Sequence, residues 1–243
     1  MGESYGPDLA YIHDVGHSAF ARDAAPGLLE LLRRAGKVGG LVVDLGCGSG
    51  IWAGELRAAG YDVLGIDQSE AMTALARARV PGAEFRTGSF LAADLPACAA
   101  VTSIGECFSY LFDKGNTGRA LGRLFRRVYG ALEPGGLLIF DVVVPGRVPG
   151  RGPQRSFREG DDWAVLVTVE EDRRQALLTR RITSFRKVGE LYRRTEEVHR
   201  LRLSDRSVLA EQLRAAGFRV RSLAGYGRLR FVRGTVGFWA RKP

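Results

Sequence analysis

Three glycines and one distant aspartate are the residues whose types and spacing best suit ligand binding. Gly46, Gly48 and Gly50 follow an apolar run, residues 41–45, and alternate along the chain. Glycine has no side chain, so such a turn lets the backbone approach a ligand closely. Asp67 comes 21 positions after Gly46, and a carboxylate at about this spacing is suited to accepting hydrogen bonds from two ribose hydroxyls.

These residues need a strand, a turn and a helix to position them. Residues 41–45 are apolar and mostly branched, which predicts a buried strand. The Ala-rich run over 51–59 predicts a helix, and 61–66 predicts a second strand that ends at Asp67. The glycine turn therefore lies between a strand and a helix, with the carboxylate of Asp67 at the tip of the neighbouring strand.

The glycine spacing separates two classes of ligand. A dinucleotide-binding turn has the spacing G-x-G-x-x-G, but position 51 is Ile51, which argues against a nicotinamide dehydrogenase. The run Val-Val-Asp-Leu-Gly-Cys-Gly-Ser-Gly, residues 42–50, resembles motif I of the class I S-adenosylmethionine-dependent methyltransferases. The resemblance implies S-adenosyl-L-methionine as cofactor and S-adenosyl-L-homocysteine as product.

The same resemblance implies which residues contact the cofactor. Asp67 would hold the ribose and Phe90 would pack on the adenine. Ser89 stands where the family often has an aspartate that binds the adenine amino group. The full set implied is Tyr11, Asp44, Gly46, Cys47, Gly48, Gly50, Asp67, Gln68, Ser89, Phe90, Ile104 and Gly105.

Candidate catalytic residues follow the predicted fourth strand, 99–104, or lie in other segments expected near the acceptor. Ligands bind at the carboxyl ends of strands in open parallel sheets, which places Glu106 and Tyr110 beside the reacting methyl group. Glu106 with a raised pKa would be a general base. His13, His17 and His199 are alternative bases near neutral pH. Each of these residues also suits a purely structural role, so the base stays open.

The rest of the chain alternates strands and helices up to residue 144. A helix is predicted over 9–20, and Pro26 suits the first turn of a second helix that ends at Gly36. Segment 1–36 resembles the helical cover of small-molecule methyltransferases, in which Tyr11 would reach the methionine end of the cofactor. Further elements are predicted as a helix capped by Ser69, a strand over 83–87, a helix over 117–132 and a strand over 137–144.

The pattern changes after residue 144. Segment 145–160 is rich in proline and glycine, which predicts an irregular connection. Segment 163–203 alternates apolar and polar residues with two turn signals, which predicts three antiparallel strands. A final helix capped by Ser204 or Asp205 follows, and strands over 218–224 and 231–240 form an apparent hairpin.

The predicted fold is an α/β, Rossmann-like sheet of seven strands flanked by helices, mostly parallel with an antiparallel C-terminal hairpin strand. Residues 1–144 and 204–243 make the cofactor-binding domain. Residues 145–203 make an inserted antiparallel subdomain that binds substrate, acts as a lid or mediates dimerisation. A homodimer is consistent with an exposed sheet edge.

Composition narrows the function classes. The 243 residues carry a net charge of +9, but the arginines are dispersed among acidic residues, which is typical of a solvated surface. The three cysteines lack metal-ligand spacing, and no metal site is predicted. No apolar run of about 18 residues and no secretory signal is visible, which predicts a cytoplasmic protein without a membrane span.

We therefore predict a methyltransferase that acts on N or O of a small molecule, in specialised metabolism. A nucleic-acid methyltransferase is the rival prediction, motivated by the basic charge. However, the loop after the fourth strand reads Ile-Gly-Glu-Cys-Phe and carries neither motif of the base-modifying enzymes, so nucleic acid is not the expected partner. A protein that binds the cofactor without transferring its methyl group is a further alternative.

Overall fold

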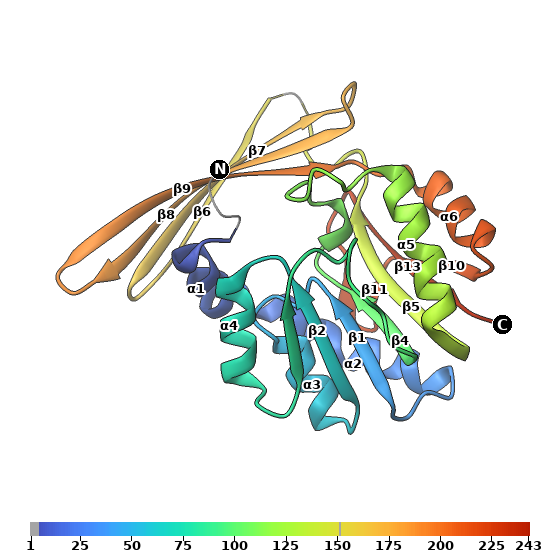
Figure 1. Cartoon of the computed structure of the whole chain (residues 1–243). Coiled ribbons are helices and arrows are strands. Elements are labelled where there is room, and N and C mark those ends of the chain that lie inside the picture. Colours follow the sequence, from blue (N-terminus) through green and yellow to red (C-terminus); the bar gives the residue numbers. More distant parts are fainter. Residues whose placement is uncertain (1–4, 151) are drawn as a thin grey trace.

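A seven-stranded sheet forms the centre of the protein (Figure 1). The computed structural model describes residues 5–150 and 152–243. The strand order is β10-β13-β5-β4-β1-β2-β3, and β13 runs antiparallel to both of its neighbours, β5 and β10. The other pairings are parallel. The predicted Rossmann-like sheet, with its antiparallel C-terminal strand, is therefore confirmed.

The elements follow one another in a regular alternation up to β5. The first half comprises α1 (Pro7–Gly16), α2 (Ala19–Arg34), β1 (Leu41–Leu45), α3 (Ile51–Ala58), β2 (Asp62–Asp67), α4 (Glu70–Arg79), β3 (Glu84–Thr87), β4 (Cys98–Ser103), the short 3₁₀ helix η1 (Cys107–Ser109) and α5 (Gly118–Ala131). The second half comprises β5 (Leu132–Val143), β6 (Gln154–Gly160), β7 (Trp163–Asp172), β8 (Leu177–Val188), β9 (Leu191–Arg202), α6 (Arg206–Ala215), β10 (Arg219–Leu223), β11 (Gly225–Tyr226), β12 (Leu229–Arg230) and β13 (Thr235–Arg241).

Helices cover both faces of the central sheet. Alternate residues of a strand point to opposite faces, so Val42 and Val43 of β1 belong to different hydrophobic clusters. Val42 packs with α2, α3 and α4, whereas Val43 packs with α5 and α6. The central strands are buried on both sides, which explains their nearly continuous apolar sequence.

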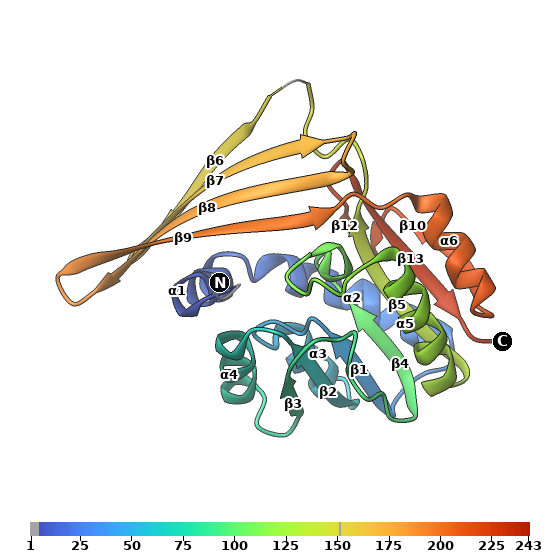
Figure 2. The same ribbon diagram turned by 45° about the horizontal axis from the view of Figure 1, so that its top comes forward.

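The segment between β5 and α6 forms a second sheet with the order β6-β7-β8-β9 (Figure 2). All of its pairings are antiparallel. The sequence predicts three strands here and an irregular connection over 145–160, and this is wrong because residues 154–160 form β6. Every residue of β6 is exposed, so the strand lacks the half-buried alternation by which strands are recognised. Its place in the sheet comes from backbone pairing with β7.

The N-terminal helices divide differently from the prediction. The helix predicted over 9–20 ends at Gly16, and α2 begins at Ala19. Pro26 lies inside α2 rather than in a first turn, so that prediction is wrong as well. Proline has no N–H to donate, so the hydrogen-bond ladder of α2 loses one bond there.

Helix α1 connects the two sheets. Leu9 and Ile12 pack with Trp163, Val165 and Ile182 of the inserted sheet. On the other side of α1, Asp14 pairs with Arg79 of α4, in the main domain. Figure 2 shows α1 between the inserted sheet and α4.

Side chains cap three helices. Ser69 accepts a hydrogen bond from the Met72 N–H at the start of α4, as predicted. Asp205 rather than Ser204 caps α6, where it accepts from two backbone N–H groups. Such caps satisfy N–H groups that have no partner within a helix.

In the described part of the chain, none of the helices combines the length and the apolar character that crossing a lipid bilayer requires.

The contact between α2 and the β11–β12 turn leads to a stability prediction. A Cβ atom at Gly27 would lie 2.3 Å from the backbone nitrogen of Gly227. We expect Gly27→Ala to lower the free energy of unfolding by about 1–3 kcal/mol, because the added methyl group overpacks this contact. Urea unfolding measures the change.

Gly130→Ala in α5 is the matched control. A Cβ at Gly130 meets no atom within 4 Å. We expect this variant to be more stable than the wild type by about 0.5–1 kcal/mol, because alanine favours the helix. Equal stability of the two variants would contradict the described packing of α2.

Candidate functional site

The glycine turn after β1 has the backbone conformation that the sequence predicts. Gly46, Gly48 and Gly50 all have positive φ angles, +80°, +52° and +76°, a region that favours glycine. A Cβ at Gly46 would lie 2.5 Å from the Sγ atom of Cys107, whereas a Cβ at Gly48 would meet nothing within 4 Å. Gly46 therefore allows close approach to η1, and Gly48 presents bare backbone to open space.

Asp67 lies against this turn at the end of β2. Its Oδ2 accepts a hydrogen bond from the Gly48 N–H at 2.9 Å, and its Oδ1 accepts from the Ser69 N–H at 2.9 Å. Burial raises the pKa of Asp67, and these N–H groups oppose that rise. Because each carboxylate oxygen has two lone pairs, Asp67 keeps acceptor capacity for a ligand.

Asp44 is the buried acid at the end of β1. Its Oδ1 accepts a hydrogen bond from the Thr102 hydroxyl at 2.7 Å, and Thr102 accepts in turn from the indole N–H of Trp52 at 3.1 Å. Burial raises the pKa of Asp44 to about 7, and the nearby charge of Asp67 adds to the rise. Asp44 is thus a carboxyl group poised between its charged and neutral forms.

A cavity of about 730 Å³ joins the glycine turn to the inserted sheet. Its walls include Gly48 and Asp67 on one side and Val165, Val167 and Ile182 on the other. Most of the candidate residues line it: His13, His17, Asp44, Gly46, Cys47, Gly48, Asp67, Gln68, Phe90, Ile104, Gly105, Glu106, Tyr110 and His199. The structure therefore brings together residues that lie up to 186 positions apart, from His13 to His199.

Tyr11 does not reach this cavity, contrary to the expectation that it contacts the cofactor. Its hydroxyl donates to Asp162 Oδ2 at 2.7 Å, and the guanidinium of Arg186 lies 3.9 Å from the centre of its ring. The first residue that the structure describes, Tyr5, lines the cavity instead. Tyr5 carries no sequence signal that distinguishes it, because its position depends on contacts with β9 and α4.

Gly50 and Ser89 are also absent from the cavity wall. Gly50 precedes α3 and lies against Ala76, where a Cβ would come within 2.9 Å. Ser89 donates a hydrogen bond to the carboxylate of Asp113, and Asp113 lines the cavity. Asp113 carries no sequence signal that distinguishes it, because it supplies a carboxylate beside Ser89 from a loop 24 positions further along the chain.

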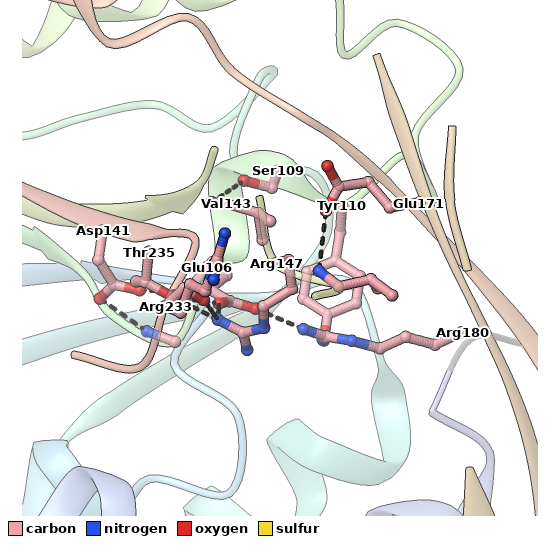
Figure 3. A network of polar contacts seen from close by, with 12 residues as sticks. Glu106, Ser109, Tyr110, Asp141, Val143, Arg147, Glu171, Arg180, Arg233 and Thr235 are labelled. Carbon is pink, nitrogen blue, oxygen red and sulfur yellow. Dashed lines mark hydrogen bonds and ion pairs between the residues drawn. The ribbon is translucent and has the colours of Figure 1, made fainter. Parts of the chain in front are cut away.

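Glu106 is held by two arginines (Figure 3). Its Oε2 lies 2.6 Å from Arg180 Nη2, its Oε1 lies 2.9 Å from Arg147 Nη1, and Oε1 also accepts from the Thr235 hydroxyl at 3.0 Å. Burial raises the pKa of Glu106, but the two guanidinium groups outweigh burial and leave it below its ordinary value. A base with a raised pKa at Glu106 is therefore the wrong prediction, because Arg147 and Arg180 come from distant segments.

Tyr110 belongs to the same network. Its hydroxyl accepts from Arg180 Nη1 at 2.8 Å and lies 3.2 Å from the hydroxyl of Tyr5. Burial raises the pKa of Tyr110. Tyr110 therefore stays protonated at neutral pH and is placed to orient polar groups.

Asp141 fixes the loop that carries Glu106. It lies fully buried in β5, and its two oxygens accept from the backbone N–H groups of Gly105 and Glu106 at 3.0 and 2.7 Å. Tyr226 donates its hydroxyl to Asp141 at 2.8 Å. Glu106 has φ +67°, which is unusual for a residue with a side chain, and the bonds to Asp141 hold it in that conformation.

His199 is the histidine with a carboxylate partner. Its Nε2 lies 2.7 Å from Glu197 Oε2, and its buried Nδ1 has no hydrogen-bond partner among the described residues. A carboxylate only accepts hydrogen bonds, so Nε2 carries a proton and donates it to Glu197. Glu197 thereby orients the ring within the cavity.

His13 and His17 are uncharged at neutral pH. Burial lowers the pKa of His13 to about 4, and the neighbouring His17 lowers it further. Burial and the charge of Arg158 also lower the pKa of His17. The two rings stack with their centres 5.8 Å apart and line the cavity beside α1.

No group of three His, Cys, Asp or Glu residues in the described ranges is arranged to hold a metal ion. Cys47 and Cys107 line the cavity, and burial raises the pKa of both thiols. Thiols with raised pKa values stay protonated at neutral pH and are poor nucleophiles. The polar chemistry of the site therefore rests on carboxylates, arginines, tyrosines and His199.

Comparison with known proteins gives consistent matches. A family described as "Methyltransferase domain" matches residues 42–136. A trans-aconitate 2-methyltransferase from Acidovorax sp. (strain JS42) is 32% identical over 140 residues, which cover 57% of this chain and 52% of that protein. The chain thus spans about half the length of that relative.

Two solved structures have the same fold. A S-adenosylmethionine-dependent methyltransferase from Clostridium acetobutylicum superposes with a TM-score of 0.82 at 17% identity, covering 96% of this chain and 97% of the other. An amino pentose methyltransferase from Micromonospora echinaspora, solved with S-adenosylmethionine bound, has a TM-score of 0.78 at 20% identity and full coverage of both chains. At these identities the likeness establishes the fold alone.

The raised pKa of Asp44 leads to a prediction about stability and pH. In the unfolded chain an aspartate has a pKa of about 3.9. Between that pH and about 7, the native state therefore binds more protons at Asp44 than the unfolded chain does. The contribution of Asp44 to the free energy of unfolding therefore falls as the pH rises through this range. Asp44→Asn keeps an oxygen for Thr102 and removes the titration.

We expect the stability of Asp44→Asn, relative to the wild type, to improve by about 1–3 kcal/mol between pH 5 and pH 8. Urea unfolding of both proteins at the two pH values measures this difference, because contributions common to both cancel. Parallel pH profiles would show that Asp44 titrates alike in the folded and unfolded chains.

Proposed function

We propose that the chain is a class I S-adenosylmethionine-dependent methyltransferase, as its match to the methyltransferase domain family and its fold support, and that it transfers a methyl group to N or O of a small molecule bound in the cavity. The observation that carries the proposal is the continuity of that cavity. The same space is lined by Gly48 and Asp67 on the main domain and by Val165 and Ile182 on the inserted sheet.

The residues around the glycine turn fit the cofactor, S-adenosylmethionine. A Cβ at Gly48 or at Gly105 would enter open space, so the bare backbone at both positions leaves room for a ligand. Asp67, fixed by two backbone N–H groups, would accept from the ribose hydroxyls. When bound, S-adenosylmethionine supplies a methyl group on a positively charged sulfur, which a nucleophile can attack in line.

We assign the adenine end to Phe90 and Asp113. Phe90 lines the cavity with its ring 5.3 Å from that of Phe108, which gives it a fixed apolar face. Asp113 occupies the place of the carboxylate that the family often has at position 89, and Ser89 orients it. A carboxylate there would accept from the amino group of adenine.

We assign the acceptor to the space under the inserted sheet. Residues 145–203 then form the acceptor-binding subdomain, and residues 5–36 form a cover over the cavity. The apolar side chains of Val165, Val167 and Ile182 would contact the body of the acceptor, since they share the face that lines the cavity. The names of the relatives, a trans-aconitate 2-methyltransferase and an amino pentose methyltransferase, support a small acceptor.

His199 is the residue we assign as the general base. Glu197 orients its ring, and Nδ1 has no hydrogen-bond partner among the described residues. An acceptor hydroxyl or ammonium group must lose a proton in the reaction, and a neutral imidazole can take it near neutral pH. Tyr110, which stays protonated, would orient the acceptor beside it.

Calorimetry with S-adenosylhomocysteine tests the cofactor site. We expect the wild type to bind, and Asp67→Ala to weaken binding by about 10–100-fold, the loss of hydrogen bonds to a charged group. Asp62→Ala is the matched control, since Asp62 begins the same strand at its other end and is exposed. No binding by the wild type, or equal affinity of the two variants, would refute the assignment.

A transfer assay tests the base. Purified protein and radiolabelled S-adenosylmethionine are incubated with a panel of amines, amino sugars, phenols and hydroxy acids. With any acceptor that is methylated, we expect His199→Gln to lower kcat by about 10²–10⁴-fold and to leave the affinity for S-adenosylhomocysteine unchanged. A kcat within about twofold of the wild type would exclude His199 as the base.

A further inference from the structure

Arg147 has an open hydrogen-bonding edge in the cavity wall. It lies in the connection after β5 and makes all its polar contacts with the described residues through Nη1, to Glu106, Thr235 and the carbonyl of Arg233 (Figure 3). Its Nη2 and Nε have no partner among the described residues and are not among the buried unpaired atoms. These two nitrogens form the side of a guanidinium that binds a carboxylate or phosphate bidentately.

The network around Arg147 holds one uncompensated positive charge. Arg147 and Arg180 share the single carboxylate of Glu106. The side chains of both arginines are largely buried, 22% and 17% exposed, and Glu106 is 9% exposed. A largely buried charge is costly unless it is paired, so this arrangement favours a ligand that brings a negative charge.

Two further arginines line the acceptor side of the cavity. The cavity wall there also carries Arg158 of β6 and Arg230 of β12, neither of which forms an ion pair with the described carboxylates. Four arginines thus face two acids on this side, Glu106 and Asp141, and burial raises the pKa of Asp141 to about 7, so the positive charges outnumber the negative ones. The acids Asp44 and Asp67 lie at the ends of β1 and β2, on the side assigned to the cofactor.

Glu106 explains why Arg147 is available in a defined geometry. Asp141 fixes the backbone of Glu106, and the Glu106 carboxylate in turn fixes Nη1 of Arg147. An arginine held on one side by a buried acid loses little conformational freedom when its other side binds a ligand. Glu106 therefore positions Arg147, and Arg147 is the residue that would contact the ligand.

We infer that the methyl acceptor carries an anionic group, a carboxylate or a phosphate, and that this group binds the open edge of Arg147. The inference rests on the proposed transfer to a small molecule and narrows its substrate class to anionic acceptors. The apolar residues of β7 and β8 then contact the body of the acceptor, and Arg158 and Arg230 add favourable charge at longer range.

Calorimetry on the protein saturated with S-adenosylhomocysteine tests this inference with two probes, citrate and inorganic pyrophosphate. In a buffer of low ionic strength without other polyanions, we expect the wild type to bind at least one probe. Arg147→Gln should weaken that binding at least tenfold, and Arg147→Lys, which keeps the charge but not the planar edge, should weaken it less. Tighter binding of citrate would indicate a carboxylic acid acceptor, and tighter binding of pyrophosphate a phosphorylated one.

Arg155→Gln is the matched control. Arg155 is an exposed residue of β6, paired with Thr168, and is not part of the cavity wall. We expect this variant to bind the probe like the wild type. Binding of neither probe by the wild type, or equal binding by the wild type and Arg147→Gln, would overturn the inference.

Binding of S-adenosylhomocysteine distinguishes a failure of the anionic-acceptor proposal from a failure of the proposed methyltransferase function. Normal binding of S-adenosylhomocysteine by Arg147→Gln shows that the variant is folded and that the cofactor site is intact. If the wild type binds S-adenosylhomocysteine and no anion, the anionic acceptor is refuted and the methyltransferase function stands. If the wild type does not bind S-adenosylhomocysteine, the proposed function itself fails.

Discussion

The pairing of one buried carboxylate, Glu106, determines how the two sheets of this protein meet. A charge that is taken out of water must find partners, and Glu106 finds Arg147 after β5, Arg180 of β8 and Thr235 of β13. Each partner belongs to a different segment, so satisfying the carboxylate fixes the inserted sheet against the main domain. Asp141 holds the loop that carries Glu106, because it accepts hydrogen bonds from the backbone N–H groups of Gly105 and Glu106. The geometry of the acceptor space thus depends on a short chain of acids and their donors.

The N-terminal segment closes this space from the other side. Glu197 accepts the backbone N–H groups of Tyr5 and Gly6, and the same carboxylate orients His199. The Ser69 hydroxyl donates to the carbonyl of Tyr5, so one short stretch of backbone touches both β9 and the start of α4. Glu197 therefore holds both His199, which we propose as the base, and the N-terminal segment that begins at Tyr5.

The fold could be predicted from the sequence wherever local pattern and local structure agree. The central strands are buried on both faces, and this gives them a recognisable apolar sequence. The turn before α3 needs positive φ angles, and this gives it a recognisable run of glycines. Strand β6 could not be recognised, because all its residues are exposed and only its pairing with β7 defines it. The state of Glu106 and the part played by Asp113 depend on partners 24 to 129 positions away, and no local pattern encodes such contacts. The position of Tyr11 away from the cavity likewise depends on distant neighbours, Asp162, which lies 151 positions along the chain, and Arg186.

The alternation of side chains along β6–β9 has an evolutionary consequence. Ser156, Val167 and Ile182 are paired across three strands on the face that lines the cavity, while their sequence neighbours point away from it. Exchanging residues at these positions would reshape the inserted-sheet side of the cavity and leave the glycine turn unaltered. If the acceptor binds under the inserted sheet, as we propose, new acceptor preferences can arise by substitutions on this one face while the residues proposed to bind the methyl donor stay unchanged.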